Sequence, residues 1–557
     1  MARAALGMRF LLISAVLVFV STLASAQYGA SLEGTVSDPS GAVISGATVT
    51  VTDQATGVSH SAVTSDAGFY RVAGLTPGRY RVETDATGFK KKTTADVQVA
   101  AESTRGLDVA LSPGAVQETV TVSAEGAALD TENASVTGNI AAQQVEELPT
   151  FGRDPYELLR LAPGVFGDGA RNAGATATFL PNTVGVGGSA NSLYQVENQP
   201  QISANGQRVT ENNFTIDGVD VNSLTNGGAS VVTPSEESIA EIKVLSGSYS
   251  AEDGRNSGAQ IKVISKTGTN VFHGGGFFKY DEPGLNAFNT FGGFEGNFQT
   301  RAPDVRVENK VRSYGASIGG PIAKNKLFFF FAFEGEHAFN KSFGINYIET
   351  PQYIQAVTAA NPNSIAAQIL AAPGITPRVV AQLTPSCADI NTPAGDCAIV
   401  PGGLDLGSPF PAGSAPGNPY LSLSNTAVGG SKIGGGLDGI PDVTLAQLVY
   451  PVPRTGEQYN ARVDWTISSA HTLSASTYLT RSTSTNPPGT DQTSAASRDV
   501  TNKPFSPAGT ILWNWTVSPT KLNEVRRTSA GLPSMKLRAP KVSSIGGFRM
   551  PRYKTFW

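Results

Sequence analysis

The distribution of apolar residues along the chain limits how it can meet a membrane. One short apolar run, FLLISAVLVFV (10–20), follows Arg3 and Arg9 and precedes the small-residue triplet ASA, which is the pattern of a cleaved export signal. We therefore expect the signal peptide, residues 1–26, to be removed; the alternative is an uncleaved anchor. No later segment has the ~18 consecutive apolar residues of a transmembrane helix. If the exported chain enters a membrane, we expect it to do so as a β-barrel.

Composition and charge exclude several functional classes. The 557 residues are too many for one compact domain, and charged residues make up only 15% of them. The formal net charge of −4 leaves no overall positive field suited to nucleic acid. The four histidines are far apart in the sequence and form no metal-binding motif: His60, His273, His337 and His471. We therefore expect no metal, no cofactor, no catalytic residue and no enzyme activity.

The two cysteines, Cys387 and Cys397, lie close together in a loop-like region. Export to an oxidising compartment makes them candidates for a disulfide, although two cysteines do not amount to a disulfide framework. The sequence leaves their redox state open.

The first mature stretch, residues 27–114, contains short alternating segments separated by turn residues. In ATVTVTD, Ala47, Val49 and Val51 alternate with threonines, which is the period-2 pattern of a half-buried strand. About six or seven such segments favour a small antiparallel β-sandwich. GTVSDPSGAVISGATVTV, TSDAGFYRVAGLTPGRYRV and ATGF resemble the carboxypeptidase regulatory-like domain, which is transthyretin-like. The resemblance implies an accessory domain without peptidase activity, either a folded spacer or a sugar-binding module.

The stretch NNFTIDGVDVN (212–222) carries two carboxylates, Asp217 and Asp220. Asp217-Gly218 is a strong signal for a two-residue hairpin turn. This turn pairs Thr215 with Asp220 and gathers four apolar residues on the other face: Phe214, Ile216, Val219 and Val221. We therefore interpret Asp217, Gly218 and Asp220 as structural, and we expect Asn to replace Asp217 with little effect. An acid–base pair would need a pocket, and a calcium loop would need more oxygen ligands.

Two short helices are expected ahead of this hairpin. QQVEEL is stopped by Pro149, and DPYELLRLAPG has Asp154 as a candidate N-cap with Pro155 at the first helical position. LPTFGRDPYELLRLAPGV, FTIDGVDVN and IAEIKVLSGSYSAEDGRNSGAQIKVISKTGTN follow one another as they do in the plug domain of TonB-dependent outer-membrane receptors. Residues 128–270 therefore resemble that plug, in the Oar-like branch of the family, in which a regulatory-like domain typically precedes it.

The linker between the sandwich and the plug, residues 115–127, contains the extended pentapeptide ETVTV. By the resemblance, this pentapeptide occupies the place of the TonB box, the segment that pairs with the inner-membrane energy-transducing complex by strand addition. The candidate residues are Glu118, Thr119, Val120, Thr121 and Val122. Alternating threonine and valine is common in β-proteins, so the assignment depends on position rather than on the motif.

From residue 271 onward the sequence has the pattern of outer-membrane strands. VRSYGASIGGPIAKNKLFFFFAFEGEH and EQYNARVDWTISSAHTLSASTYLTRS are expected to be hairpins. We expect the Phe-rich run of the first to contact lipid and to form part of an aromatic girdle: Phe328 to Phe331 and Phe333. Residues 345–455 are interpreted as a long extracellular loop with one or two short helices.

The barrel region, residues 271–557, is short for a closed barrel that encloses a plug. By the resemblance the family's barrel has twenty-two strands, and at ~10 residues per strand plus connections this region could hold that number only with almost no loops. The sequence pattern itself indicates about six to eight strands. The tail 525–557 is rich in Lys and Arg, has no acidic residue and does not alternate. We therefore expect a mainly β chain with a transthyretin-like β-sandwich, an α+β plug and a partial antiparallel outer-membrane β-barrel. Because of this tail, we expect the chain to be a truncated or frame-shifted product.

By the resemblance, the chain is expected to be a TonB-dependent receptor that takes up or binds a ligand with energy from the inner membrane. The alternative is a surface-binding or adhesion protein that uses the same modules without transport. The expected partners are a TonB-type complex, outer-membrane lipid, the barrel-assembly machinery and an extracellular ligand, with no nucleic acid among them. The expected location is the outer membrane of a Gram-negative bacterium, with the regulatory-like domain on the periplasmic side. The ligand is not predicted.

Overall fold

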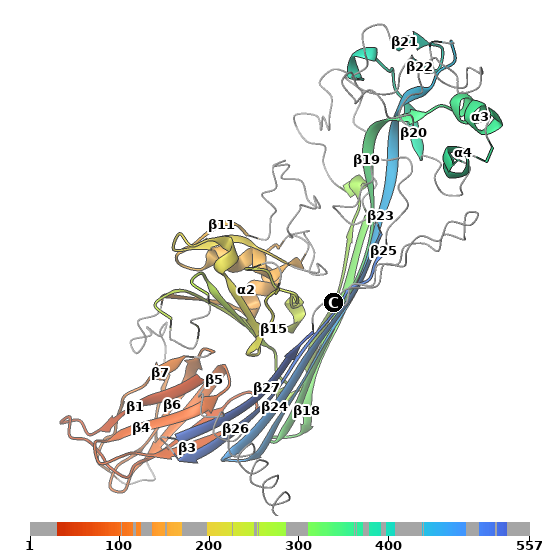
Figure 1. Ribbon diagram of the computed structural model, residues 1–557. Helices are drawn as coiled ribbons and strands as arrows, with labels where there is room; N and C mark the ends of the chain where they lie inside the picture. The colour runs from red at the N-terminus through yellow and green to blue at the C-terminus, as the bar shows by residue number, and fades with distance from the viewer. Residues whose placement is uncertain are drawn as a thin grey trace, which may run out of the picture.

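The computed structural model describes three β-rich units that follow one another along the chain (Figure 1). The described residues are 30–114 except 102, 119–123, 136–169 except 151 and 152, 198–249 except 225 and 226, 253, 256–285, 310–370 except 361 and 364, 378–390, 397–406, 437, 439–485 and 501–531 except 519 and 520. The expected signal peptide and Glu118 lie outside the described residues.

The first unit is a sandwich of two sheets, as expected from the alternating pattern. One sheet contains β1 (Ala30–Ser37), β4 (Phe69–Leu75), β7 (Thr104–Gly106) and β8 (Val109–Ala110). The other runs in the order β3 (Ser59–Val63), β2 (Thr48–Asp53), β5 (Gly78–Asp85), β6 (Lys91–Val99) and β9 (Thr119–Ser123). Val49 and Val51 of β2 are fully buried between the sheets, whereas the neighbouring Thr48 is exposed. The period-2 prediction for this strand is confirmed.

The second unit, the plug, is a mixed sheet with short helices. Its sheet runs in the order β10 (Val136–Ala141), β15 (Ile239–Gly247), β16 (Gln260–Ser265), β13 (Asn213–Ile216) and β14 (Val219–Asp220). A separate ribbon contains β11 (Val165–Gly169) and β12 (Gln201–Ala204). The helical segments are α2 (Ala142–Glu147), η2 (Pro155–Leu161), η3 (Val209–Glu211) and η4 (Glu236–Ser238). No helix in the described part of the chain is long and apolar enough to cross a membrane.

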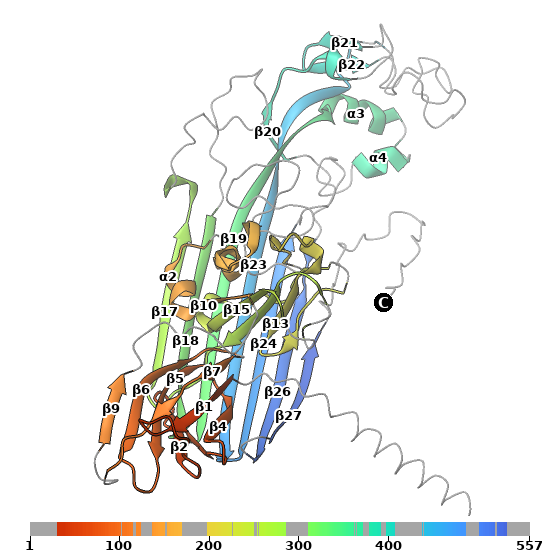
Figure 2. The same ribbon diagram turned by 90° about the vertical axis from the view of Figure 1, so that its left-hand side faces the viewer.

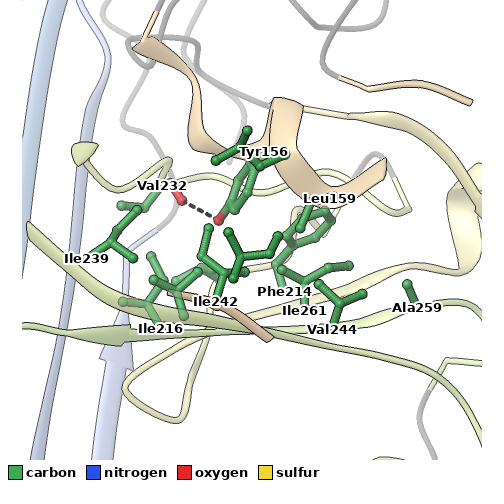
Figure 3. Close-up of a cluster of buried hydrophobic side chains, with 14 of the residues drawn as sticks. Tyr156, Leu159, Phe214, Ile216, Val232, Ile239, Ile242, Val244, Ala259 and Ile261 are labelled. Atoms are coloured by element: carbon green, nitrogen blue, oxygen red, sulfur yellow. Dashed lines mark hydrogen bonds between the residues drawn. The ribbon is translucent and has the colours of Figure 1, made fainter. Parts of the chain in front are cut away.

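The plug core forms where η2 packs on the central strands (Figure 3). Asp154 caps η2, because its carboxylate accepts a hydrogen bond from the Tyr156 backbone N–H at 2.9 Å. The element is a 3-10 helix, which the sequence did not distinguish from an α-helix. The Tyr156 ring lies 4.9 Å from that of Phe214, and the Tyr156 hydroxyl donates to the carbonyl oxygen of Val232 at 3.5 Å. Tyr156 therefore joins the helical layer to the buried face of the hairpin at β13.

The third unit is a curved antiparallel sheet of long strands. Its path runs β17 (His273–Asp281), β18 (Lys310–Ala323), β19 (Leu327–Glu349), β23 (Val443–Ser468), β24 (His471–Thr485), β26 (Phe505–Ser518) and β27 (Lys521–Ala530). The short β25 (Thr501–Asn502) pairs with β24. Among the described residues β17 and β27 end the path and are not paired with each other. The sandwich and the plug lie along one face of this sheet, which we call the inner face (Figure 2).

Two expected boundaries in this region are wrong. Residues 345–349 and 443–455 belong to β19 and β23 rather than to a loop, because these strands stay paired from Leu327–Trp465 to Glu349–Val443. Likewise, residues 525–530 belong to β27, which pairs with β26, so the atypical tail does not begin at residue 525. The sequence did not indicate this end of the strand, because its charged residues resemble a polar tail. In the structure these residues occupy exposed or partly exposed positions of the strand.

The expectation that the Phe-rich run faces lipid is wrong for two of its five members. Successive side chains of a strand point to opposite faces. Phe328 and Phe330 are therefore buried on the inner face, 3% and 2% exposed, whereas Phe331 is 39% exposed on the outer face. A run of identical apolar residues conceals this alternation.

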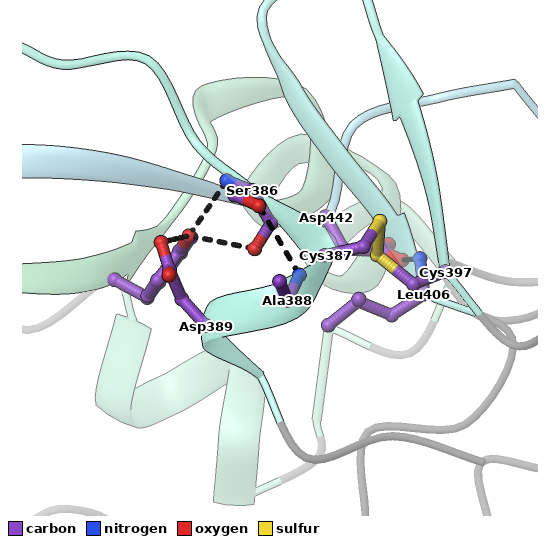
Figure 4. The surroundings of a disulfide bond; sticks show 8 residues. Ser386, Cys387, Ala388, Asp389, Cys397, Leu406 and Asp442 are labelled. Carbon is purple, nitrogen blue, oxygen red and sulfur yellow. Dashed lines mark hydrogen bonds between the residues drawn. A yellow bond between two sulfur atoms is a disulfide. The ribbon is translucent and has the colours of Figure 1, made fainter. Parts of the chain in front are cut away.

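The connection from β19 to β23 carries a small folded unit, which we call the head (Figure 1). Its elements are α3 (Pro351–Ala360), α4 (Ile365–Leu370), β20 (Val379–Gln382), η7 (Cys387–Asp389), β21 (Cys397–Val400) and β22 (Gly403–Leu406). A disulfide joins Cys387 to Cys397 and ties η7 to β21 (Figure 4). On the other side of β22, the Leu406 backbone N–H donates to the Asp442 carboxylate at 2.8 Å. The head is thus more structured than the expected loop.

Reduction of the Cys387–Cys397 disulfide is expected to loosen the head alone. The bond closes a loop with a sequence separation of 10, for which chain entropy predicts a stabilisation of about 2–3 kcal/mol. Hydrogen exchange should therefore speed up at the amides of β21 and β22 after reduction, while exchange in β24 and β26 stays unchanged. Unchanged exchange in β21 and β22 would show that the disulfide does not stabilise them.

Candidate functional site

The hairpin of β13 and β14 presents its turn to the inner face of the long-stranded sheet. Asp217 and Gly218 have φ angles of 47° and 75°, the positive values that a type I′ turn requires. Thr215 pairs with Asp220, which is the register expected from the sequence. The apolar face of the hairpin is buried: Phe214, Ile216, Val219 and Val221.

The Asp217 carboxylate does more than form the turn. It accepts hydrogen bonds from the Ser265 backbone N–H at 2.9 Å, the Ser265 hydroxyl at 2.7 Å and the Ser476 hydroxyl of β24 at 2.7 Å. It also pairs with the Arg462 guanidinium of β23 at 3.3 Å, and both side chains are buried. Asp217 is thus the turn residue that the sequence predicts, and its charge also links the plug to the barrel sheet, a contact that replacement by Asn would weaken.

Arg462 is held from a second side by its own strand. Its Nε lies 3.0 Å from the Asp464 carboxylate, and Asp464 also accepts a hydrogen bond from the Ser474 hydroxyl at 2.7 Å. The guanidinium thus lies between two carboxylates, one from the plug and one from the barrel sheet. A buried arginine needs such partners, because an unpaired buried charge is strongly destabilising.

Gly218 has close contact with a second arginine of the sheet. A Cβ atom placed on Gly218 would lie 2.2 Å from Nη1 of Arg526 in β27, so a larger residue would have to displace that side chain. Arg526 in turn pairs with Glu524 of the same strand. The turn therefore fits between arginines of β23 and β27, and glycine serves both the positive φ and the close approach.

A second ion cluster joins the plug to β19, the strand that pairs with β23 in the sheet. Arg153, just before η2, pairs with Glu236 at 2.8 Å and with Glu334 of β19 at 2.9 Å. Its guanidinium also lies 3.7 Å from the ring centroid of Phe277 in β17. Arg153 has a φ of 59°, uncommon for a residue other than glycine, so the local backbone is shaped to place this side chain.

Uncharged groups join the two units between the ion clusters. The Gln458 side chain of β23 accepts from the Ser235 backbone N–H and donates to the Thr233 carbonyl oxygen, both at 2.7 Å. Tyr478 of β24 donates to the Ser238 hydroxyl at 3.3 Å and packs in the plug core. The inner face therefore recognises the plug mainly through polar groups.

The sequence analysis missed Arg153, Glu334 and Arg462. A signal for the barrel residues was present, because charged and amide side chains recur at every second position of strands that are otherwise apolar. In β19 the inner positions include Glu334 and Glu336, and in β23 they include Gln458 and Arg462, all buried. Such alternation predicts a polar inner face. It does not identify the partner on the plug.

The candidate TonB-box residues Thr119 to Val122 lie in β9, the last strand of one sandwich sheet. β9 pairs in parallel with β6, from Lys91–Thr119 to Ala95–Ser123. Strand structure suits a segment that a partner binds by strand addition. This segment therefore lies in the sandwich and not in the plug.

No group of three or more potential metal ligands occurs among the described residues. A cavity of about 100 Å³ lies where the sandwich, the plug and the barrel sheet meet, between His60, Ile264 and Asp464. It is small beside the ~300 Å³ that ligand pockets usually reach. The cavity therefore does not qualify as a substrate pocket.

Family models match both ends of this architecture. The outer membrane beta barrel domain matches residues 264–537, and the carboxypeptidase regulatory-like domain matches residues 31–112. The chain thus combines a regulatory-like β-sandwich with an outer-membrane barrel domain, and the match supports an outer-membrane location.

Two of the proteins that the chain resembles are described as transporters. The TonB-dependent transporter Oar of Myxococcus xanthus is 26% identical over 274 residues, which is 49% of this chain and 23% of Oar. The chain is a homologue of this transporter, of whose length it spans about a quarter. The solved structure of the outer membrane transporter YddB of Escherichia coli is also similar, with a TM-score of 0.38 and 13% sequence identity. The similarity covers 71% of this chain and 38% of the YddB chain. Hydroxyquinol 1,2-dioxygenase of Pseudomonas putida DLL-E4 resembles 17% of the chain, with a TM-score of 0.14 and 8% identity.

Replacing Asp217 by Asn should lower the free energy of opening of the contact between the plug and the barrel sheet by about 1–3 kcal/mol. The reason is that the buried Arg462 loses one of its two anionic partners. The free energy of local opening, measured by hydrogen exchange at the amides of β13 and β14, gives this value. The matched control is Asp220→Asn, the same change at an exposed position of the same hairpin, expected to cost less than about 0.5 kcal/mol. A double-mutant cycle with Arg462→Met should show coupling. Equal effects of the two Asn variants would contradict the assignment.

The plug should become less stable as the pH rises, because of Asp154. Burial raises the pKa of this carboxyl from 3.8 to about 7, against the hydrogen bonds from Tyr156 and Asn198 that lower it. The folded state therefore binds the proton more tightly than the unfolded state. The stabilisation is fully present below pH 3.8 and is lost by about pH 7, at up to about 1.4 kcal/mol per pH unit.

Protection factors at the amides of η2, which divide out the intrinsic pH dependence of exchange, should therefore fall between pH 5 and pH 8. Asp154→Asn cannot titrate and should remove most of this dependence. A fall of the same size in the variant would assign the effect to another group.

Proposed function

We propose that this chain works as a TonB-dependent outer-membrane transporter that takes up a ligand with energy supplied from the inner membrane. The observation that carries the proposal is the seating of the plug on the inner face of the barrel sheet through buried ion pairs, Asp217 with Arg462 and Arg153 with Glu334. In this proposal the plug covers the inner face of the sheet and so blocks the passage along that face. Homology to Oar supports the same function.

The polar character of this interface suits a plug that has to move. The plug core is almost self-contained, with Tyr478 and Ala508 as its contributions from the barrel sheet. The other contacts described above are ion pairs and hydrogen bonds, which water can replace when the units separate, and the contact of Arg153 with the Phe277 ring. A shared apolar core would resist separation, whereas polar interfaces permit relative motion.

The ends of the strands support an orientation in the membrane. Turns are short between β18 and β19 and between β23 and β24, whereas the head fills the long connection at the other end. Outer-membrane barrels have short periplasmic turns and longer extracellular loops. The sandwich contacts the short-turn end, where the Asn270 N–H donates to the Ala55 carbonyl oxygen at 3.0 Å. In this proposal the sandwich is periplasmic and the head extracellular.

The proposed partner is a TonB-type protein that adds a strand to residues 118–122. The test uses the purified C-terminal domain of the TonB-type protein of the source bacterium, with binding to the full chain measured by calorimetry. Val120→Pro should abolish binding, because proline removes a backbone donor, whereas Val120→Thr should preserve it. A surface-binding protein without transport would show no binding in any form, and that result would contradict the proposal.

The proposed orientation has an independent test in intact cells. Protease added outside should cut the head and leave the sandwich intact until the outer membrane is permeabilised. Cleavage of the sandwich in intact cells would reverse the orientation.

A further inference from the structure

The outer face of the long-stranded sheet has an uncharged part near the short turns, which we call the apolar band. Four strands contribute the ranges in which no outer position carries a charge: 314–322 of β18, 327–335 of β19, 459–465 of β23 and 473–479 of β24. Exposed apolar side chains such as Ile318, Phe331 and Val463 occupy these positions. Such a surface suits the hydrocarbon of a membrane.

The band ends abruptly on the side of the head. In each of the four strands, the next outer position beyond the band holds an exposed ionisable residue: Arg312, His337, Glu457 and Arg481. Arg312 pairs with His337, and Glu457 pairs with Arg481. The change from apolar to ionisable residues therefore falls at nearly the same level in neighbouring strands.

The height of the band matches a membrane. In the pair of β19 and β23, Leu327 lies opposite Trp465 near the short turns, and His337 lies opposite Thr455. At ~3.4 Å per residue and a strand tilt of ~40°, the ten steps from Trp465 to Thr455 rise about 26 Å. Outer-membrane barrels have an apolar band ~25 Å tall. Arg312 and His337 therefore lie at the level of the lipid headgroups.

Two further cations lie just beyond this level. Lys310 is two residues from Arg312 in β18, so both side chains point to the outer face, where they are exposed. Lys310 pairs with Phe339 of β19, and Lys341 follows Phe339 on the same face. We call the outer positions from Arg312 to Lys341 and Arg481 the head-side rim.

Aromatic rings hold three of the rim cations at the surface. The distances from the cation to the ring centroid are 5.8 Å for Arg312 over Tyr280, 5.9 Å for Lys341 over Phe339 and 5.3 Å for Arg481 over Phe505. A cation is attracted to the face of an aromatic ring. The ring has no net charge, so the cation keeps its charge and can still bind an anion.

The rim keeps an excess of positive charge. Its described carboxylates are Glu457, which accepts a hydrogen bond from the Tyr459 hydroxyl at 3.2 Å, and Glu282, which accepts one from the Tyr280 hydroxyl at 2.7 Å. Glu457 lies opposite Arg481 in the strand register. The pair of Lys310 and Arg312 has no carboxylate opposite it in β19, where His337 and Phe339 stand.

We propose that the head-side rim binds phosphate groups on the headgroup of an anionic membrane lipid, with Lys310 and Arg312 at the centre of the site. The Arg312 guanidinium offers paired N–H donors that fit a phosphate, and Lys310 adds a second charge on the same face. The apolar band below the rim accommodates the acyl chains. Only the leaflet rests on the proposed function, because the orientation proposed there makes the occupant a phosphorylated lipid of the outer leaflet.

The first test measures lipid binding by the purified full chain in a neutral detergent, with native mass spectrometry as the readout. The probe is lipid A that carries two phosphates. Lys310→Gln combined with Arg312→Gln should weaken binding at least tenfold. The matched control combines Lys324→Gln with Lys326→Gln, which removes the same charge from exposed positions of the β18–β19 turn. Equal binding by the two variants would overturn the inference.

A charge-preserving variant separates loss of the site from loss of the fold. Lys310→Arg combined with Arg312→Lys keeps both charges and should retain binding within about threefold of the unmodified chain. Lipid A without its phosphates should bind to the unmodified chain at least tenfold more weakly than the phosphorylated form, and added salt should reduce only the binding of the phosphorylated form. Equal binding of the two lipids would assign the contact to acyl chains and overturn the inference.

The leaflet is tested in intact cells with a photoreactive amino acid in place of Phe339 at the rim or Ile467 near the short turns, both of which are exposed. Mass spectrometry should identify a phosphorylated glycolipid captured at position 339 and a glycerophospholipid at position 467. Exchange of the two lipids would overturn the leaflet assignment together with the proposed orientation. Failure of the detergent experiment would instead overturn the phosphate site and leave the proposed transport function intact.

Discussion

A buried arginine on a barrel strand cannot remain without an anion, and this constraint organises the contact between the plug and the sheet. Arg462 lies on the inner face of β23 with Asp464 on one side and Asp217 of the plug on the other. The turn that carries Asp217 must therefore reach the sheet, which in turn sets the position of the five-stranded plug sheet. Arg153 and Glu334 repeat the arrangement on the side of β19. The plug is thus held to the sheet at two points, on the paired strands β23 and β19.

The alternation of side chains along the barrel strands makes this arrangement compatible with a membrane. Polar residues at inner positions meet the plug, while the outer positions of the same strands carry exposed apolar residues such as Val463 and Trp465 next to Arg462 and Asp464. The aromatic stack of His471, Trp513 and Trp515 lies near the short-turn end, with ring centroids about 6 Å apart. One strand thus presents polar residues to the plug on one face and apolar residues on the other.

Features that depend on neighbouring residues were predictable from the sequence, and features that depend on distant ones were not. The Asp217-Gly218 turn and its register follow from local backbone preferences, and so does the cap at Asp154. The partner of Asp217 lies 245 residues away, and no local pattern identifies it. The parallel pairing of β9 with β6 was missed for the same reason, because an alternating Thr-Val segment fits many sheet edges. The second part of β27, residues 525–530, was missed because its charged residues suggested a tail.

Spin-label distances between the plug and the barrel sheet test the central claim most directly. One label replaces Asp220, which is exposed on β14, and the other replaces Val463, which is exposed on the outer face of β23 beside Arg462. If the buried ion pair seats the plug, pulsed electron paramagnetic resonance should give one narrow distance distribution that broadens when Arg462 is replaced by Met. A distribution that is already broad with Arg462 in place, or one that stays narrow without it, would contradict the account.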